Sequence, residues 1–292
     1  MNLAIRLACF TILLLSPLAT ADDWPQWRGP QRDGTWQETG LVEKFAAPEL
    51  KISWRKPIGS GYSGPTVADG RVFVTDRLVE PTQVERVHAF NEKTGESLWT
   101  FSYPCEYVNV GYTAGPRASV SIDEGRAYAL GTMGHLHAFD AASGKLLWAK
   151  DLNTEYNIRM PIWGISASPL VDGKLVIVQI GGEHACLVAF DKVTGEERWR
   201  ALDDNASYSA PVIIQQAGKP VMVCWTGDSI VGMNAQTGEV YWRHPFKPAK
   251  MVINIATPVL AGGRLFFTSF YDGSVMLEVN DKELAVRELW SR

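Results

Sequence analysis

The sequence contains little cysteine, and its cysteines are widely separated. Of four in 292 residues, Cys9 lies in an apolar run near the N-terminus, and Cys105, Cys186 and Cys224 are isolated from one another. No two have the close spacing of a zinc site or the density of a disulfide framework. We expect the last three to be small buried apolar residues, although one pair could bridge in an oxidising compartment.

Long apolar segments and basic clusters are also missing. Beyond the N-terminal run, the sequence contains no stretch of 18 consecutive apolar residues, so it predicts no membrane span in the mature protein. Lys and Arg total 28 against 32 Asp and Glu, which gives a net charge of -4. Without a basic stripe, the sequence does not favour nucleic acid as a partner.

Residues 1–21 have the pattern of a secretory signal peptide. Arg6 precedes an apolar run at 7–15, and Ala19-Thr20-Ala21 forms a small-x-small cleavage site before Asp22. A lipid-anchored protein would place cysteine directly after that site. We therefore predict an exported chain without a lipid anchor, with an uncleaved N-terminal anchor as the alternative.

Against these absences stands a regular series of tryptophans. Six of them lie 43 to 51 residues apart, and four close a phrase of the form Ala-x-Asp-x-x-Thr-Gly-x-x-x-Trp. A fixed period of about 20 to 50 residues is typical of repeat architectures, in which each unit packs on its neighbours. The series consists of Trp54, Trp99, Trp148, Trp199, Trp242 and Trp290.

Each period contains four short β-rich runs separated by Asp-Gly or Gly-Gly turns, without helical periodicity. In the first unit these runs span 65–69, 71–76, 85–90 and 97–101. Four antiparallel strands per unit of this length indicate a blade of a β-propeller. We therefore predict an all-β fold of four-stranded antiparallel blades.

The phrase also predicts how blades join. Its Asn or Asp and its Gly suit a hairpin turn, because the polar side chain bonds its own backbone and Gly accepts positive φ. A small first residue leaves room for a large side chain from the next blade, and the tryptophan can fill that room and bury about 200 Å². The alternative is that the tryptophans form a sugar-binding ladder.

The phrase resembles the tryptophan-docking motif of PQQ-like (pyrroloquinoline-quinone-type) β-propeller repeats, and the match runs from about residue 52 to 290. That superfamily includes quinoprotein alcohol dehydrogenases and the propeller lipoprotein of the bacterial outer-membrane barrel assembly machine. The opening Trp24-Pro-Gln-Trp27-Arg-Gly-Pro30 resembles the start of exported bacterial proteins of this kind. The resemblance implies a periplasmic or envelope-associated location.

The blade count predicts an incomplete ring. Residues 50–57, with Trp54, look like a last strand without its first three, and five full blades follow. The resembling family usually has eight blades, so we expect this chain to be part of a longer protein. The alternative is a small propeller that uses the stray strand as an outer strap. The predicted domains are a signal peptide at 1–21, a strap at 22–49 and the propeller at 50–292.

The resemblance implies markers for a quinoprotein enzyme that this chain does not match. They are an adjacent cysteine pair, a tryptophan platform, and Glu, Asn and Asp groups for calcium and a base. The cysteines are isolated and no residue aligns with the calcium ligands, so we predict no catalytic, cofactor-binding or metal residues; PQQ and calcium are not supported. His135 and His137 could form half of a metal site, but His137 aligns with His88 before the motif Ala, which favours a structural role.

The remaining candidate is the ring mouth. Loops before each innermost strand are rich in aromatic and polar residues, and such loops converge on the axis of a propeller. We predict a binding surface there, with a simple plug of the channel as the alternative. Its residues are Tyr62, Tyr112, Arg117, Arg159, Trp163, Tyr208 and Asn254.

Three functions follow as hypotheses. The first is a non-catalytic exported scaffold for protein contacts in the bacterial envelope, similar to the barrel-assembly lipoprotein. The second is a PQQ-dependent alcohol dehydrogenase. The third is a polysaccharide-binding propeller using Trp24, Trp27, Trp36 and Trp163.

Overall fold

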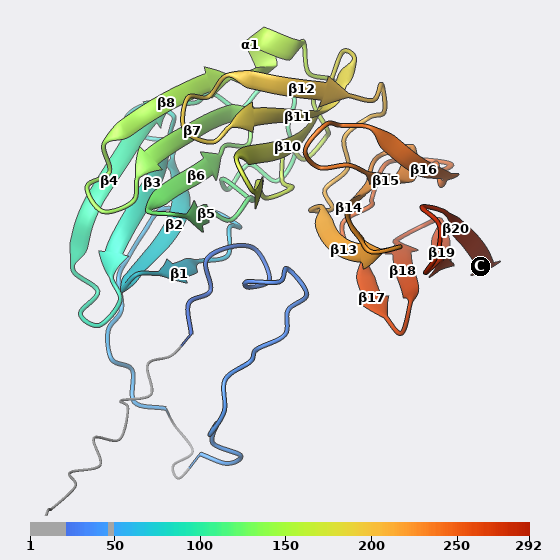
Figure 1. Ribbon diagram of the computed structural model, residues 1–292. Helices are drawn as coiled ribbons and strands as arrows, with labels where there is room; N and C mark the ends of the chain where they lie inside the picture. The colour runs from blue at the N-terminus through green and yellow to red at the C-terminus, as the bar shows by residue number, and fades with distance from the viewer. Residues whose placement is uncertain (1–21, 46–49) are drawn as a thin grey trace, which may run out of the picture.

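The computed structural model describes residues 22–45 and 50–292, which form an all-β fold (Figure 1). Its strands build five separate four-stranded antiparallel sheets, and one short helix is the only α-helix in the described part of the chain. The sheets fan out in an arc as blades of a propeller, so the predicted fold class is confirmed. The predicted signal peptide, 1–21, lies outside the described residues.

Each blade is a meander of four consecutive strands. In every sheet the strand order follows the chain order, from a short innermost strand to an outer last strand. The blades comprise β1 (Thr66–Ala68), β2 (Arg71–Leu78), β3 (Val84–Asn91) and β4 (Ser97–Pro104); β5 (Ser121–Asp123), β6 (Arg126–Leu130), β7 (His135–Asp140) and β8 (Leu146–Asp151); β9 (Leu170–Asp172), β10 (Leu175–Gly182), β11 (Ala185–Asp191) and β12 (Glu197–Ala201); β13 (Val212–Gln216), β14 (Lys219–Trp225), β15 (Ser229–Met233) and β16 (Val240–Pro245); β17 (Val259–Ala261), β18 (Arg264–Ser269), β19 (Gly273–Val279) and β20 (Val286–Ser291).

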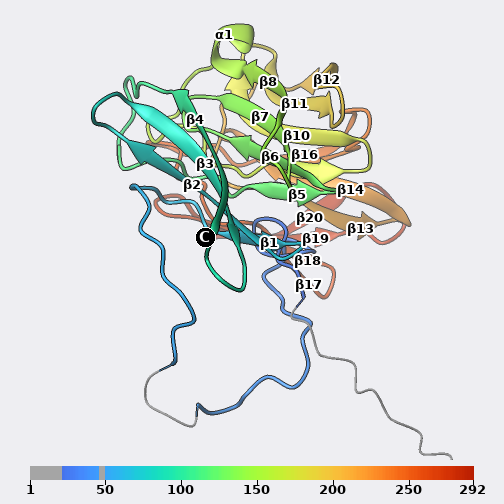
Figure 2. The ribbon, with the colours of Figure 1, turned by 90° about the vertical axis from the view of Figure 1, so that its left-hand side faces the viewer.

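The innermost strands lie on the concave side of the arc, where β1 contacts β5 and β5 contacts β9. In Figure 2 the first blade faces the viewer, with its strands β2, β3 and β4 above the short β1. Apolar side chains fill the space between neighbouring blades: Ile177 and Leu187 of the third blade pack with Met222 of the fourth. The core is therefore a series of layers between sheets, as expected when a single blade cannot bury both of its faces alone.

The tryptophan of each docking phrase joins two blades. Trp199 on β12 pairs with Ala189 on β11, and its indole lies against Gly238 in the fourth blade. Its Nε1 donates to the carbonyl of Ala235, 3.0 Å away. This corrects the expected direction of docking: the small first residue makes room for the tryptophan of its own blade, which then reaches the Gly turn of the next.

The same arrangement recurs at three other tryptophans and changes at the last two. Trp54, Trp99 and Trp148 lie against the glycines of the following turns, Gly95, Gly144 and Gly195. The fifth blade has no Thr-Gly turn. The Nε1 of Trp242 donates instead to Oε1 of Gln216 in its own blade, 2.9 Å away, and Trp290 is 38% exposed.

The segment around Trp54 forms no β-ladder. Residues 50–57 are assigned no strand, and the described part of the chain offers them no neighbouring strand. Trp54 is nevertheless docked, since its Nε1 donates to the carbonyl of Glu92 at 2.7 Å. A tryptophan outside any strand thus suffices to cover the Gly95 turn of the first blade.

The helix α1 (Leu152–Tyr156) was not predicted from the sequence. Asp151 caps its N-terminus by accepting from the backbone N–H of Thr154, and Asn157 ends it in the left-handed conformation. It is a single turn held by burial of Leu152 and Tyr156, too short for periodicity to reveal. Across 22–45 and 50–292, no helix has the length and apolar character needed to cross a membrane.

The three described cysteines are buried and free. Burial raises the pKa of the Cys105, Cys186 and Cys224 thiols, which keeps them protonated at neutral pH. They therefore behave as small apolar side chains.

Candidate functional site

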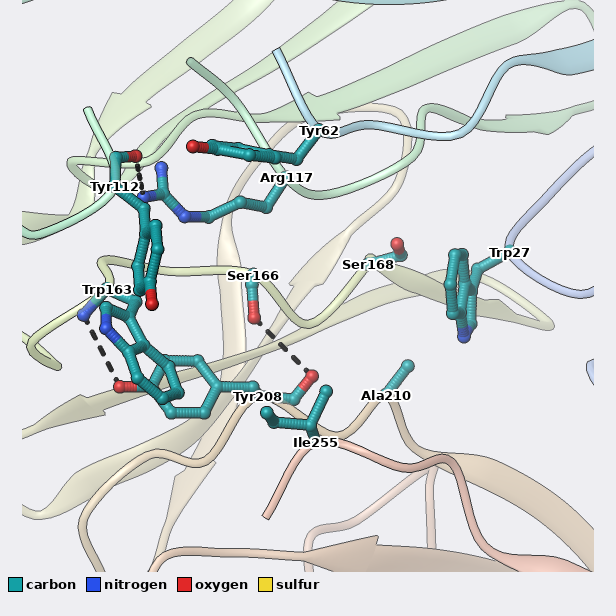
Figure 3. Close-up of a pocket in the computed structure, with 10 residues that line it drawn as sticks. All are labelled: Trp27, Tyr62, Tyr112, Arg117, Trp163, Ser166, Ser168, Tyr208, Ala210 and Ile255. Carbon is teal, nitrogen blue, oxygen red and sulfur yellow. Dashed lines mark hydrogen bonds between the residues drawn. The ribbon is translucent and has the colours of Figure 1, made fainter. Parts of the chain in front are cut away.

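The loops that lead into the five innermost strands meet at one pocket (Figure 3). In each blade, the residue four positions before the first residue of the innermost strand faces this pocket. The repeat therefore places one side chain per blade at an equivalent point around the axis. These five residues are Tyr62, Arg117, Ser166, Tyr208 and Ile255.

The N-terminal segment forms part of the same region. Trp24 makes a two-way backbone bridge with Val67 of β1, and the carbonyl of Pro25 accepts from the N–H of Ile122 in β5. Trp27 then donates from Nε1 to Oγ1 of Thr257 before β17, 2.9 Å away. Residues 22–36 thus run along the inner strands rather than around the outside.

The pocket has a volume of about 430 Å³ and is mostly apolar in lining. Trp27 and Trp163 lie at opposite ends of it, and small side chains lie between them (Figure 3). The lining residues are Trp27, Tyr62, Tyr112, Arg117, Trp163, Ser166, Ser168, Tyr208, Ala210 and Ile255.

Three aromatic rings form a continuous wall. Tyr112 meets Trp163 edge-on with centroids 5.7 Å apart, and Trp163 lies 5.1 Å from Tyr208. A backbone hydrogen bond of 2.6 Å from Gly111 N–H to the Ile162 carbonyl joins the two loops that carry Tyr112 and Trp163. Such pairs add stability beyond the buried area alone, so the wall is held in place without a ligand.

Among the described residues that line the pocket, Arg117 provides the only charged group. Its guanidinium lies 5.3 Å above the ring of Tyr62. Nη1 donates to the Gly115 carbonyl and to Oγ1 of Thr132, and Nη2 donates to the carbonyls of Gly111 and Tyr112. Burial lowers the pKa of Arg117 from its ordinary value, but an arginine remains cationic at neutral pH.

A second arginine, Arg32, is bonded to the backbone of the lining residue Ser168. Arg32 is 2% exposed and donates to the carbonyls of Ser168 and Pro169, at 3.0 and 2.9 Å. Burial lowers its pKa to about 10, so it too stays charged at neutral pH. The pocket therefore has one cation, Arg117, among its lining residues and a second, Arg32, bonded to the backbone of Ser168.

The structure brings together five of the seven predicted mouth residues and separates two. Tyr62, Tyr112, Arg117, Trp163 and Tyr208 line the pocket. Arg159 is exposed and donates to the carbonyls of Asp203 and Asp204, and Asn254 is fully buried and donates from Nδ2 to the Thr226 carbonyl. Both support loops near the pocket without lining it.

Five lining residues were missed by the sequence reasoning. An alignment on the first residue of each innermost strand would have found four of them. The position two residues before each innermost strand always holds a small side chain, and it supplies Ser168 and Ala210 to the lining; its residues are Gly64, Ser119, Ser168, Ala210 and Thr257. The position four residues before each strand supplies Ser166 and Ile255. Trp27 carried no such signal, because it lies outside the repeats.

The histidine pair and the tryptophans of the sugar-binding hypothesis pack against other parts of the chain. His135 and His137 stack with centroids 6.4 Å apart, and burial together with His135 lowers the pKa of His137 to about 4. Trp24 and Trp36 meet edge-on at 6.0 Å in a recess separate from the pocket that holds Trp27 and Trp163. The four tryptophans of the sugar-binding hypothesis thus do not share one surface.

The pocket does not fit a quinone held by calcium. Calcium takes six to eight oxygen ligands, several of them carboxylates, but the ten lining residues contain no Asp or Glu. Within the described ranges, no three His, Cys, Asp or Glu side chains are placed to hold a metal ion. The lining residues therefore match a binding surface better than a quinone–calcium centre.

Comparison with known proteins places the chain among propellers of two kinds. It is 26% identical over 269 residues to the outer membrane protein assembly factor BamB of Burkholderia pseudomallei, spanning 87% of this chain and 62% of that protein. It is 26% identical over 198 residues to a quinohemoprotein alcohol dehydrogenase of Comamonas testosteroni, spanning 62% of this chain and 26% of that protein. The chain thus covers less than two thirds of either relative.

Solved structures give the same fold. A europium-containing methanol dehydrogenase superposes with a TM-score of 0.68 at 14% identity, over 91% of this chain and 58% of that one. BamB from Moraxella catarrhalis superposes with a TM-score of 0.52 at 15% identity, over 76% of this chain and 58% of that one. A family model described as outer membrane protein assembly factor BamB matches residues 83–292. The chain therefore belongs to this family of PQQ-like β-propellers.

Proposed function

We propose that the protein is a non-catalytic scaffold of the bacterial cell envelope that holds a protein partner in the axial pocket. The observation that carries this proposal is the convergence of all five blade loops, with Tyr, Arg, Ser, Tyr and Ile at one equivalent position, on a preformed aromatic wall. Tyr, Trp and Arg are the residue types that dominate binding energy at protein interfaces. The BamB-type family model and relatives support the same role.

Export belongs to the same proposal. Residues 1–21 would direct the chain out of the cytoplasm, residues 22–49 would act as the strap, and residues 50–292 would form the propeller. The relatives in the BamB group are named as outer membrane assembly factors, which supports an envelope location. Fractionation of cells that express the full chain, with a probe for loss of the leader, tests this part.

Photo-crosslinking tests the binding role. A photoreactive phenylalanine at Tyr112, which is exposed at the pocket mouth, should crosslink to a discrete protein partner in intact cells. The matched control carries the same group at Tyr271, an exposed tyrosine outside the pocket, and should not. Trp163→Ala in the first variant should abolish the crosslink, because it removes the centre of the aromatic wall.

A quinoprotein alcohol dehydrogenase is the second candidate, since relatives of this chain are named quinohemoprotein or quinoprotein alcohol dehydrogenases. Purified full-length protein supplied with PQQ and calcium should then oxidise alcohols in a dye-linked assay. Such activity, together with no crosslink at position 112, would overturn the scaffold proposal.

A further inference from the structure

We propose that the pocket recognises a peptide segment in which a large apolar side chain, preferably aromatic, is flanked by acidic residues. This inference depends on the proposed function, because it specifies the partner for the same pocket.

The shape selects a bulky apolar group. About 430 Å³ of space is bounded by Tyr112, Trp163 and Tyr208 on one side and by Trp27 at the far end, and Ser166, Ser168 and Ala210 leave the middle open. The wall is fixed before binding, since backbone hydrogen bonds join its loops, including Tyr208 N–H to the Asn254 carbonyl at 3.0 Å. A preformed apolar cleft of this kind favours an aromatic side chain, which loses few degrees of freedom on binding.

The positive charge of two arginines favours acidic residues on either side of the bound aromatic side chain. Arg117 already donates four hydrogen bonds within the chain, so it offers a partner mainly its positive charge. Arg32 adds a second buried cation under Ser168. Neither arginine takes part in any of the ion pairs found in the described part of the chain.

One buried carboxylate lies behind the wall and only partly balances these charges. Glu85 accepts from the hydroxyl of Tyr107, which also contacts Oγ1 of Thr132, the acceptor of an Arg117 hydrogen bond. Arg77, whose guanidinium lies 3.8 Å from the centroid of the Tyr107 ring, shares this carboxylate's surroundings. Arg77 pairs with Glu85 in the β2–β3 ladder, Arg117 is linked to Glu85 through Thr132 and Tyr107, and the ten lining residues add no further carboxylate.

The pocket should therefore attract acidic residues of the partner without fixing their exact positions. Because the donors of Arg117 are occupied, an acid in the partner needs proximity to the pocket mouth rather than a fixed bidentate position. Affinity should therefore depend on the sign of the flanking charges and on salt more than on their exact spacing. A basic segment with the same aromatic residue should be repelled.

Fluorescein-labelled peptides test these expectations with the full chain. One peptide carries a central Phe between Asp residues in a Gly-Ser background, a second replaces Asp by Lys, and a third replaces Phe by Ala. Fluorescence anisotropy should rank the Asp-Phe peptide tightest by about tenfold or more over each of the others. Raising NaCl from about 0.1 M to about 1 M shortens the Debye length from about 10 Å to about 3 Å and should remove most of the Asp-over-Lys preference.

Variants assign the effects to the pocket. Tyr112→Asn keeps the positive φ of 53° at that position, which Asn tolerates, and should weaken the Asp-Phe peptide about three- to tenfold. Tyr271→Asn is the matched control outside the pocket and should leave binding unchanged. Arg117→Lys should keep the preference for Asp over Lys flanks and Arg117→Met should lose it; thermal unfolding of both variants shows whether each is folded.

The results separate this inference from the function on which it rests. Equal binding of the Asp and Lys peptides, or no effect of Tyr112→Asn, overturns the inference even if position 112 still crosslinks to a protein partner. Binding of a neutral polysaccharide but of no peptide overturns it as well. Failure of both the crosslink and every peptide removes the scaffold proposal itself.

Discussion

The interface between the third and fourth blades and the outer face of the fifth blade use the same type of tryptophan in opposite ways. Trp199 is 9% exposed and bonded to the turn of the next blade, whereas Trp290 is 38% exposed. Val259 and Leu260 on the innermost strand of the fifth blade are also exposed. No blade follows Trp290 within the described residues, so a tryptophan is buried only where a neighbouring blade lies against it.

Trp242 shows the intermediate case. The fifth blade offers it no Gly turn, yet it is buried, because Gln216 of its own blade accepts its indole N–H and Gly232 lets the ring lie directly on the strand. The fourth and fifth blades then pack through apolar side chains such as Phe267 and Leu277. Interfaces of one fold can thus be closed by different local means.

The largest expected effect separates the two tryptophans themselves. Trp199→Ala should lower the free energy of unfolding by about 3–5 kcal/mol, because it leaves a cavity between two blades. Trp290→Ala should cost less than about 1 kcal/mol, since the side chain is partly in water already. Urea unfolding followed by circular dichroism measures both; equal losses would show that docking onto the next turn is not what stabilises the interface.

A second pair tests the receiving turn. Gly238 and Gly263 have nearly the same φ, 75° and 73°, but an added Cβ would lie 2.8 Å from the Trp199 ring at Gly238 and would meet nothing at Gly263. Gly263→Ala should therefore cost only the conformational strain, about 1–2 kcal/mol, and Gly238→Ala should cost about 1–2 kcal/mol more. Thermal unfolding of the two variants measures the difference, and the steric account fails if they are equally destabilised.

The third comparison concerns acid, at the interface of the first two blades. Here His137 lies 4.4 Å from the ring of Tyr103, and burial lowers its pKa from 6.5 to about 4. Between these two pH values His137 is protonated in the unfolded chain but neutral in the folded chain. The free energy of unfolding should therefore fall as the pH drops from about 6.5 to about 4, by about 1–2 kcal/mol at pH 5. The apolar interface of Trp199 gives no such dependence.

Comparing His137→Phe with the unsubstituted protein isolates this contribution. The phenylalanine keeps the stacked ring beside Phe139 and does not titrate, so the difference in unfolding free energy between pH 7 and pH 5 should shrink. An unchanged difference would assign the acid sensitivity to other groups.

The repeat made the blades predictable, because their turns and docking tryptophans are local features that recur with a fixed spacing. The same regularity placed Tyr62, Arg117 and Tyr208 at the mouth, since corresponding loops must converge when blades share an axis. Arg159 and Asn254 were assigned to that surface by the same argument, but the place of a loop does not tell which way each of its side chains points.

What the sequence did not reveal are contacts between segments without a repeat. Trp27 lies in the pocket because residues 22–36 run along the inner strands, and that path depends on distant partners such as Thr257. The single-turn helix after β8 was missed for the opposite reason, since five residues are too few to show a period.

The contact of Trp27 with Thr257 also has a consequence in time. These residues are 230 positions apart, so Trp27, which precedes all five blades, cannot make this contact until the segment before the fifth blade has been synthesised. Closing so long a loop is entropically costly and belongs late in folding. The earlier blades can therefore assemble one by one as they emerge, whereas the pocket, with Trp27 as one end, is completed only once Thr257 is in place.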